Sequence, residues 1–301
     1  MANSREISER IKSIKDTRKI TNAMFLIASS NLTRARENLD RAEPHFKASQ
    51  RVIWHILHHV PDMEDRYFGN DERSAEKIGA PKRGYLVITG DKGLAGAYNH
   101  NVIKLVCEDV KRPGESVIFP CGLNGQHYFY KHNMPCDEEF QFSAYKPTIH
   151  RARAITDYIL ELYNNYELDE IYVVYTGVKG KLEAKAEIHQ LLPINKSEFF
   201  EVSSPEKKYD TLFLPSPRAV MNTIIPNYLT GYIFGAMVEA FYTEQNARMT
   251  AMQSATKSAD EMLAELSVSY NRARQAEITQ EMTEVTGGVR ANKISGQEGR
   301  R

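Results

Sequence analysis

The feature that most constrains this chain is an apolar seam through its first sixty residues. Alternating steps of four and three residues from Ile7 to Val60 meet an apolar side chain at almost every position, and the exceptions are Arg18, Thr21 and Ser49. A 3.5-residue repeat held this long predicts a helix with one continuous apolar face, as in coiled coils. At 1.5 Å per residue this helix is about 80 Å long, whereas helices of compact domains usually have roughly three turns.

A second seam runs through the last eighty residues. Between Gly231 and Leu266 the same spacing meets mostly apolar or small side chains, and alanines recur at every fourth residue in its middle. Such a stripe of alanines allows another helix to approach closely. Pro226 before this run and the pair Gly287-Gly288 after it are typical start and stop signals of a helix.

Two long helices at opposite ends of one chain satisfy each other best as an antiparallel pair. We therefore expect a two-helix coiled coil, or shaft, made of residues 1–60 and 216–288. Pro44 lies inside the first helix, and its missing N–H predicts a bend there. Residues 289–301 are polar, which predicts a flexible tail.

The middle of the chain has a different pattern. Short apolar runs typical of buried strands occur at Tyr85–Thr89, Ser116–Phe119, Ile171–Thr176 and Thr211–Leu214. The segments between them that read as helices are Asn99–Lys111, Gln126–Lys131 and Ile149–Tyr163. Strands that alternate with helices predict a small, Rossmann-like open α/β domain over residues 80–215, with residues 61–80 as its linker to the shaft.

Composition argues against several classes of protein. Lys plus Arg is 39 and Asp plus Glu is 39, so the chain lacks the positive field of a general nucleic-acid binder. The cysteines Cys107, Cys121 and Cys136 are widely spaced without a CxxC, which predicts neither a disulfide framework nor a zinc site. The charged N-terminus is unlike a signal peptide. The longest apolar stretch, near Gly231–Tyr242, is too short to cross a bilayer.

Three features invite a functional interpretation. The turn Gly90–Gly96 has the spacing G-x-x-G-x-x-G, which is neither a dinucleotide fingerprint nor a Walker A, so a structural turn is favoured over a phosphate cradle. His55, His58 and His59 share a helix without a suitable fourth ligand, so packing is favoured over metal binding. No catalytic constellation is recognisable, and we expect neither a cofactor nor a metal.

The two ends of the chain resemble a known family. Residues 5–36, REISERIKSIKDTRKITNAMFLIASSNLTRAR, are similar to the N-terminal signature of the gamma subunits of F-type ATP synthases. Residues 246–288, which include ARM, AM and YNRARQAEITQEMTEVTGG, are similar to the family's C-terminal signature. TGDKGLAGAYNHNV, which begins at Thr89, resembles its first strand and glycine turn.

The resemblance implies a non-catalytic subunit. In this family the two helices form the central rotor shaft, which transmits rotation of the membrane ion-driven rotor to a ring of three alpha and three beta subunits during ATP synthesis driven by the proton-motive force. The implied partners are the alpha, beta and epsilon subunits and the c-ring, with one gamma copy per complex. The resemblance also implies regulation of ATPase activity and ion flow, and a peripheral position on the cytoplasmic face of a bacterial membrane or the equivalent organellar face.

By the family's pattern, contacts with the beta catch loops fall on Arg248, Arg274 and Gln275, and Met24 faces the same region. If the helices pair antiparallel, we expect Met24 to lie opposite the segment that contains Arg274. The segment FLIASSN departs from the family, which is richer in alanine and lysine there, and the tail after Gly288 is longer and more basic.

Two other interpretations of the same residues stay open at this point. One is a coiled-coil scaffold or tether with an α/β head and no rotary role. The other is a Rossmann-like enzyme with helical arms. Tight nucleotide binding by the isolated chain would favour the enzyme, and co-purification with a nucleotide-binding alpha/beta hexamer would separate the shaft from the scaffold.

Overall fold

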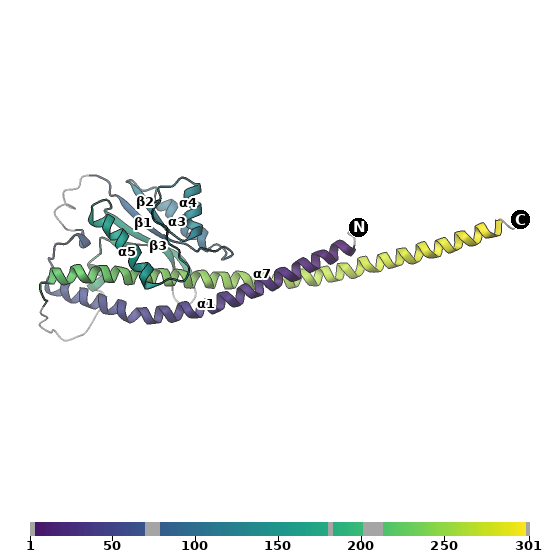
Figure 1. The fold of residues 1–301 in the computed structure, drawn as a ribbon, viewed down its shortest axis with the longest axis horizontal. Helices are drawn as coiled ribbons and strands as arrows, with labels where there is room; N and C mark the ends of the chain where they lie inside the picture. Colours follow the sequence, from purple (N-terminus) through teal and green to yellow (C-terminus); the bar gives the residue numbers. More distant parts are fainter. Residues whose placement is uncertain (1–3, 70–78, 180–182, 201–212, 299–301) are drawn as a thin grey trace. The chain divides into compact units, whose positions relative to one another are not determined.

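A computed structural model of the chain describes residues 4–69, 79–179, 183–200 and 213–298. The chain divides into two compact units, one formed by Met1–Ile27 with Met249–Arg301 and the other by Ala28–Arg248. Two long helices contribute to both units, α1 (Ser4–His59) and α7 (Pro217–Glu298), as labelled in Figure 1. Two long terminal helices and a small α/β fold between them were expected from the sequence, and this fold class is confirmed.

The second unit is built around a four-stranded sheet with the order β2-β1-β3-β4. The strands are β1 (Arg83–Ile88), β2 (Ser116–Cys121), β3 (Glu170–Lys179) and β4 (Glu183–Leu192). Strand β1 pairs in parallel with both β2 and β3, with its first residue opposite the first residue of each. Strand β4 is antiparallel to β3 and closes that edge of the sheet.

Helices cover both faces of this sheet. Successive side chains of β1 point to opposite faces, and both sets pack on helices. Tyr85 and Val87 pack with side chains of α3 (Tyr98–Asp109) and α4 (Leu123–Lys131). Leu86 and Ile88 pack in the larger core with side chains of α5 (Ile149–Asn164), α1 and α7. The carboxyl end of α1 belongs to this larger core, since Ile53, Ile56 and Leu57 are fully buried there.

Hydrogen bonds of polar side chains also join the first part of α7 to the sheet and to α3. Glu239 on α7 accepts a hydrogen bond from the backbone N–H of Val178, with an N···O distance of 2.7 Å. Thr243, one turn further along, donates its hydroxyl to the carbonyl of Thr176 at 2.9 Å. The buried hydroxyl of Tyr98 donates to the carbonyl of Ala240 at 2.9 Å. Helix α7 is therefore bonded directly to β3 and to α3.

Several boundaries differ from the sequence-based predictions. Helix α7 begins at Pro217, one residue after the expected boundary at 216, because proline is tolerated in the first turn of a helix. It passes through Pro226, so the interpretation of that proline as a start signal is wrong. It also continues through Gly287-Gly288 to Glu298, which contradicts the predicted stop. Each glycine lowers helix stability by about 1 kcal/mol without terminating a helix. The proposed division into domains and tail stays a prediction.

The segments that connect the helices and strands also differ from the sequence-based predictions. Residues 61–69 are packed rather than a free linker, because they contain the 3-10 turn η1 (Arg66–Phe68) and the buried side chains of Met63 and Tyr67. The short helix α6 (Ser197–Phe200) follows the sheet. Of the predicted strand at 211–214, residues 211–212 lie outside the described residues, and 213–214 are not strand.

Candidate functional site

The glycine turn after β1 lies close to acidic side chains. The carbonyl of Gly90 accepts bonds from the side chain and the backbone of Asn124, and its N–H donates to Asn99 at 2.8 Å. A Cβ at position 90 would lie 2.9 Å from the carboxyl group of Glu244, so a larger residue there would require the Glu244 side chain to move. A carboxylate beside the turn repels phosphate, which favours the interpretation as a structural turn.

Asp91 fixes the next part of the turn. Its carboxylate accepts hydrogen bonds from the backbone N–H groups of Leu123, Ala144 and Tyr145, at 3.0 to 3.3 Å, and from the hydroxyl of Ser143. A carboxylate with this many donors is well satisfied, and it joins the turn to the start of α4 and to the segment before α5.

Arg248 on α7 closes the turn from the other side. Its guanidinium donates to Oε1 of Glu244 at 2.5 Å, to the carbonyl of Lys92 at 2.9 Å and to the carbonyl of Gly93 at 3.1 Å. The side chains of this ion pair are only 7% and 4% exposed. We call the contact of Arg248 and Glu244 with residues 90–93 the α7 latch. Burial raises the pKa of the Glu244 carboxyl, although the neighbouring Arg248 opposes that shift.

The α7 latch changes how Arg248 is understood. The family's pattern suggested an outward contact with a partner, but the structure places the side chain inside the second unit with its donors bonded within the chain. Glu244 and Arg248 are four residues apart on one helix, so the spacing of an ion pair was visible in the sequence. Their burial was not visible, because it depends on the fold of the glycine turn. Whether Arg248 also touches a partner stays a prediction.

The first unit is an antiparallel pair of helices with a defined register. The hydroxyls of Thr21 and Thr256 lie 2.8 Å apart, and the N–H of Ser4 donates to Glu277 at 3.1 Å. Between these two contacts Arg18 forms an ion pair with Asp260. Helix α7 then continues beyond the start of α1, from Glu277 to Glu298.

This register separates the predicted contact residues. Met24 lies opposite the turn of α7 just before Thr256, so the expectation that it faces Arg274 is wrong. Helical rise puts the two positions about 30 Å apart along the pair. Met24 is half-buried, and both Arg274 and Gln275 are exposed. Their contacts with beta catch loops remain predictions.

The helix pair carries large apolar side chains that are exposed among the described residues of its unit. On α1 the large exposed ones are Ile20, Leu26 and Ile27. On α7 beyond the start of α1, Met282 and Val285 are 66% and 67% exposed. A contiguous apolar patch is typical of a surface that another protein covers, so these side chains are where we expect a partner to bind.

The histidines near the end of α1 are packed among aromatic rings. The ring of His58 stacks on Trp54 with centroids 5.2 Å apart, and the ring of His59 meets Phe213 edge-on at 5.8 Å. Among the described residues there is no group of three or more His, Cys, Asp or Glu side chains placed to hold a metal ion. Within the same residues no helix is long and apolar enough to cross a membrane.

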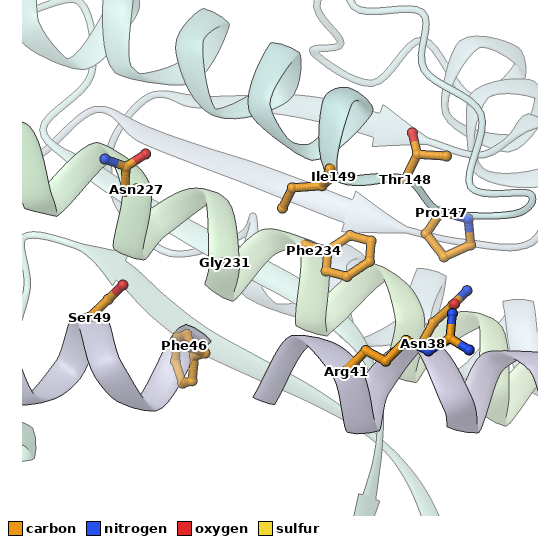
Figure 2. A pocket seen from close by; sticks show the side chains of 10 residues that line it. All are labelled: Asn38, Arg41, Phe46, Ser49, Pro147, Thr148, Ile149, Asn227, Gly231 and Phe234. Carbon is orange, nitrogen blue, oxygen red and sulfur yellow. The ribbon is translucent and has the colours of Figure 1, made fainter. Parts of the chain in front are cut away.

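A cavity of about 450 Å³ lies in the second unit between α1, α7 and the start of α5 (Figure 2). Phe46, Phe234 and Ile149 supply its apolar lining, and Arg41 with Asn227 supplies polar groups. Figure 2 shows Phe234 beside Ile149 and Pro147, so this wall is formed by α7 and the N-terminal end of α5.

Comparison with known proteins gives a consistent result. A family profile described as ATP synthase matches residues 3–291. The ATP synthase gamma chain of Ruminiclostridium cellulolyticum is 44% identical, covering 96% of this chain and 98% of that protein. That of Acetivibrio thermocellus is 39% identical over 97% of this chain and 100% of its own length. The sodium-ion-specific gamma chain of Acetobacterium woodii is 34% identical over 96% and 98%.

Solved structures share the fold. A chain of the Euglena gracilis mitochondrial ATP synthase, in the OSCP/F1/c-ring part, has a TM-score of 0.59 and 17% identity, covering 96% of this chain and 94% of that chain. A central stalk/c-ring chain from Tetrahymena thermophila has a TM-score of 0.55 and 19% identity, covering 78% of this chain and 99% of its own.

Proposed function

Because the chain belongs to the ATP synthase gamma-chain family, we propose that it is the central rotor shaft of an F-type ATP synthase. The shaft transmits rotation of an ion-driven membrane rotor to a hexamer of alpha and beta subunits during ATP synthesis. It carries no catalytic residues of its own and regulates ATP hydrolysis and ion flow by controlling which catalytic site opens. Its partners are alpha, beta, epsilon and the c-ring, with one copy per complex, peripheral on the cytoplasmic face of a bacterial membrane or the equivalent face of an organelle membrane.

The observation that carries this proposal is the helix pair of the first unit. Its register is fixed by the Thr21–Thr256 and Ser4–Glu277 contacts, yet large apolar side chains lie on its outer surface. A scaffold helix pair would bury such side chains, whereas a shaft inside a ring needs an apolar surface that the surrounding alpha and beta subunits cover. One shaft in a threefold ring also contacts its three neighbours differently, so it favours a different state in each.

The α7 latch supports the transmission of torque. Force applied to the α/β fold reaches α7 through the bonds that Arg248 makes with the carbonyls of Lys92 and Gly93 in the glycine turn. Removal of Arg274, Gln275 and the rest of residues 272–301 is the sharpest test, because this segment lies wholly in the first unit. The exposed Arg274 and Gln275 are proposed, with Met24 and Arg248, as contacts for beta catch loops.

The experiment compares complexes assembled with the full chain and with a chain that ends at Asn271. We expect the shortened chain to assemble but to synthesise less ATP per ion translocated, with the fluorescence of Trp54 in the second unit unchanged when the chain is measured alone. A matched control is Arg5→Ala at the exposed start of α1, which should leave coupling intact. Full coupling in the shortened chain would refute a shaft role for this segment, and loss of the Trp54 signal would show that the fold was damaged.

A further inference from the structure

A second cavity in the Ala28–Arg248 unit has an unusual lining. It has a volume of about 380 Å³ and lies between α1 and α7 beside β3. Its lining includes three aromatic residues, Phe46, Tyr175 and Tyr232, and two acidic residues, Asp40 and Glu239. Volumes of a few hundred Å³ with apolar walls and few polar groups are typical of sites for small molecules.

Glycines of α7 keep this cavity open. Gly231 and Gly235 are one turn apart and both line it. A Cβ at Gly235 would meet no atom within 4 Å, so packing within the described chain does not require a glycine there. At Gly231 a Cβ would come within 3.3 Å of the Phe46 ring and push on it. Glycine weakens a helix interior, so its place here is explained by the space that it leaves.

The charge of the cavity is negative. Asp40 and Glu239 are the charged residues among its described lining. Burial, and then the Glu239 carboxylate, raise the pKa of the Tyr175 hydroxyl, so this ring stays uncharged at neutral pH. Glu239 is held in place because its Oε1 accepts the N–H of Val178 at 2.7 Å. The Phe46 and Tyr232 rings meet at 59° with centroids 6.2 Å apart, which forms an aromatic corner.

We propose that this cavity binds a small organic cation that carries a methylated ammonium group. Aromatic faces attract cations, and a nearby carboxylate supplies the counter-charge. A methylated ammonium fits better than a primary one, because a primary ammonium is strongly hydrated and aromatic rings cannot replace its hydrogen bonds to water. Phe46, Tyr175 and Tyr232 surround the methyl groups, and Glu239 balances the charge. The lining of this site includes none of the four residues proposed as contacts for beta catch loops.

The test is calorimetric titration of the full chain with choline and with 3,3-dimethylbutan-1-ol, its uncharged analogue of the same shape. We expect saturable binding of one choline per chain, and binding of the alcohol that is weaker by about tenfold. Equal affinity for the two compounds would overturn the proposal, because the cavity would then be a plain apolar pocket. Absence of saturable choline binding would overturn it as well.

Two variants locate the site. Gly235→Leu fills the cavity, and Glu239→Gln removes the charge but keeps an oxygen for the Val178 N–H, so each should weaken choline binding by about tenfold or more. Gly287→Leu is the matched control. It makes the same change at another glycine of α7, in the other unit, where an added Cβ would likewise meet no described atom within 4 Å. Binding unchanged in both cavity variants, or lost in the control, would refute the site.

Discussion

Replacement of Arg248 by alanine is expected to destabilise the second unit strongly. The change removes the guanidinium that neutralises Glu244 and that donates to the carbonyls of Lys92 and Gly93. It leaves the Glu244 carboxyl group buried against the turn without its cation. Breaking a buried ion pair by removing one partner costs about 3–5 kcal/mol. Whole domains are stable by only about 5–15 kcal/mol, so the loss is a large share of the total.

A double variant that removes both charges distinguishes the energy of the ion pair itself from the cost of leaving the Glu244 carboxylate buried without a cation. If Glu244→Gln accompanies Arg248→Met, no charge is left buried, and the cost should be smaller than that of Arg248→Ala by about 2 kcal/mol or more. Arg18→Ala is the contrasting case. Its ion pair with Asp260 is equally short, but both side chains are 51% exposed, so its loss should cost at most about 1 kcal/mol.

The assay is urea unfolding of the full chain, followed by the fluorescence of Trp54. This side chain is the one tryptophan of the sequence, and it lies on the part of α1 that belongs to the second unit, so the signal reports on that unit alone. Circular dichroism follows the helix pair for Arg18→Ala. A cost below about 1 kcal/mol for Arg248→Ala would refute the argument, as would equal costs for the single and double variants.

Two further predictions concern the same region. Burial raises the pKa of Glu244 above its ordinary value of 4.5, so the stability of the native chain relative to Glu244→Gln should be greatest below pH 4.5 and should fall as the pH rises through the raised pKa. Urea midpoints of the two proteins, measured across this range, test the prediction. A relative stability that rises with pH would contradict it. Gly122 has a φ of +108° and a Cβ there would lie 2.2 Å from the carbonyl oxygen of Thr89, so Gly122→Ala should cost about 3 kcal/mol or more in urea unfolding. Gly93→Ala, where a Cβ meets nothing within 4 Å, is the control and should cost little.

The long helices were predictable because their pattern is long. A seam from Ile7 to Val60 has so many repeats that single polar interruptions do not hide it, and α1 spans Ser4–His59 as expected. Pro226 and Gly287-Gly288 are local signals that do not mark the ends of α7, which spans Pro217–Glu298. The cost of those residues is small compared with the packing of a helix of 82 residues, so tertiary contacts override the local signals.

Strand β4 was missed for a related reason. Its sequence, EAKAEIHQLL, is rich in charged and polar residues, because it lies at an edge of the sheet and only part of it is covered. The signal was the alternation around Ala186 and Ile188, whose side chains pack on the core formed with α3. Alternation over so few residues is weak evidence on its own.

The candidate site was only partly accessible to sequence reasoning. The family's pattern drew attention to Arg248, but the glycine turn that surrounds its guanidinium is more than 150 residues away along the chain. The register of the helix pair depends on which hydroxyls and charges meet, as at Thr21 with Thr256, and an apolar seam alone allows several registers. Met24 was therefore assigned to the wrong part of α7.

The hydrogen bonds between α7 and the α/β fold have a geometric consequence. Glu239 accepts the N–H of Val178 and Thr243 donates to the carbonyl of Thr176, both in β3, while the carbonyl of Ala240 accepts the hydroxyl of Tyr98. Advancing α7 by one residue would turn every side chain about 100° around the helix axis and break all of these bonds together. Purely apolar contacts tolerate such slippage, whereas directional bonds at fixed positions do not. The rotation of α7 about its own axis, relative to the sheet, is therefore fixed by these hydrogen bonds.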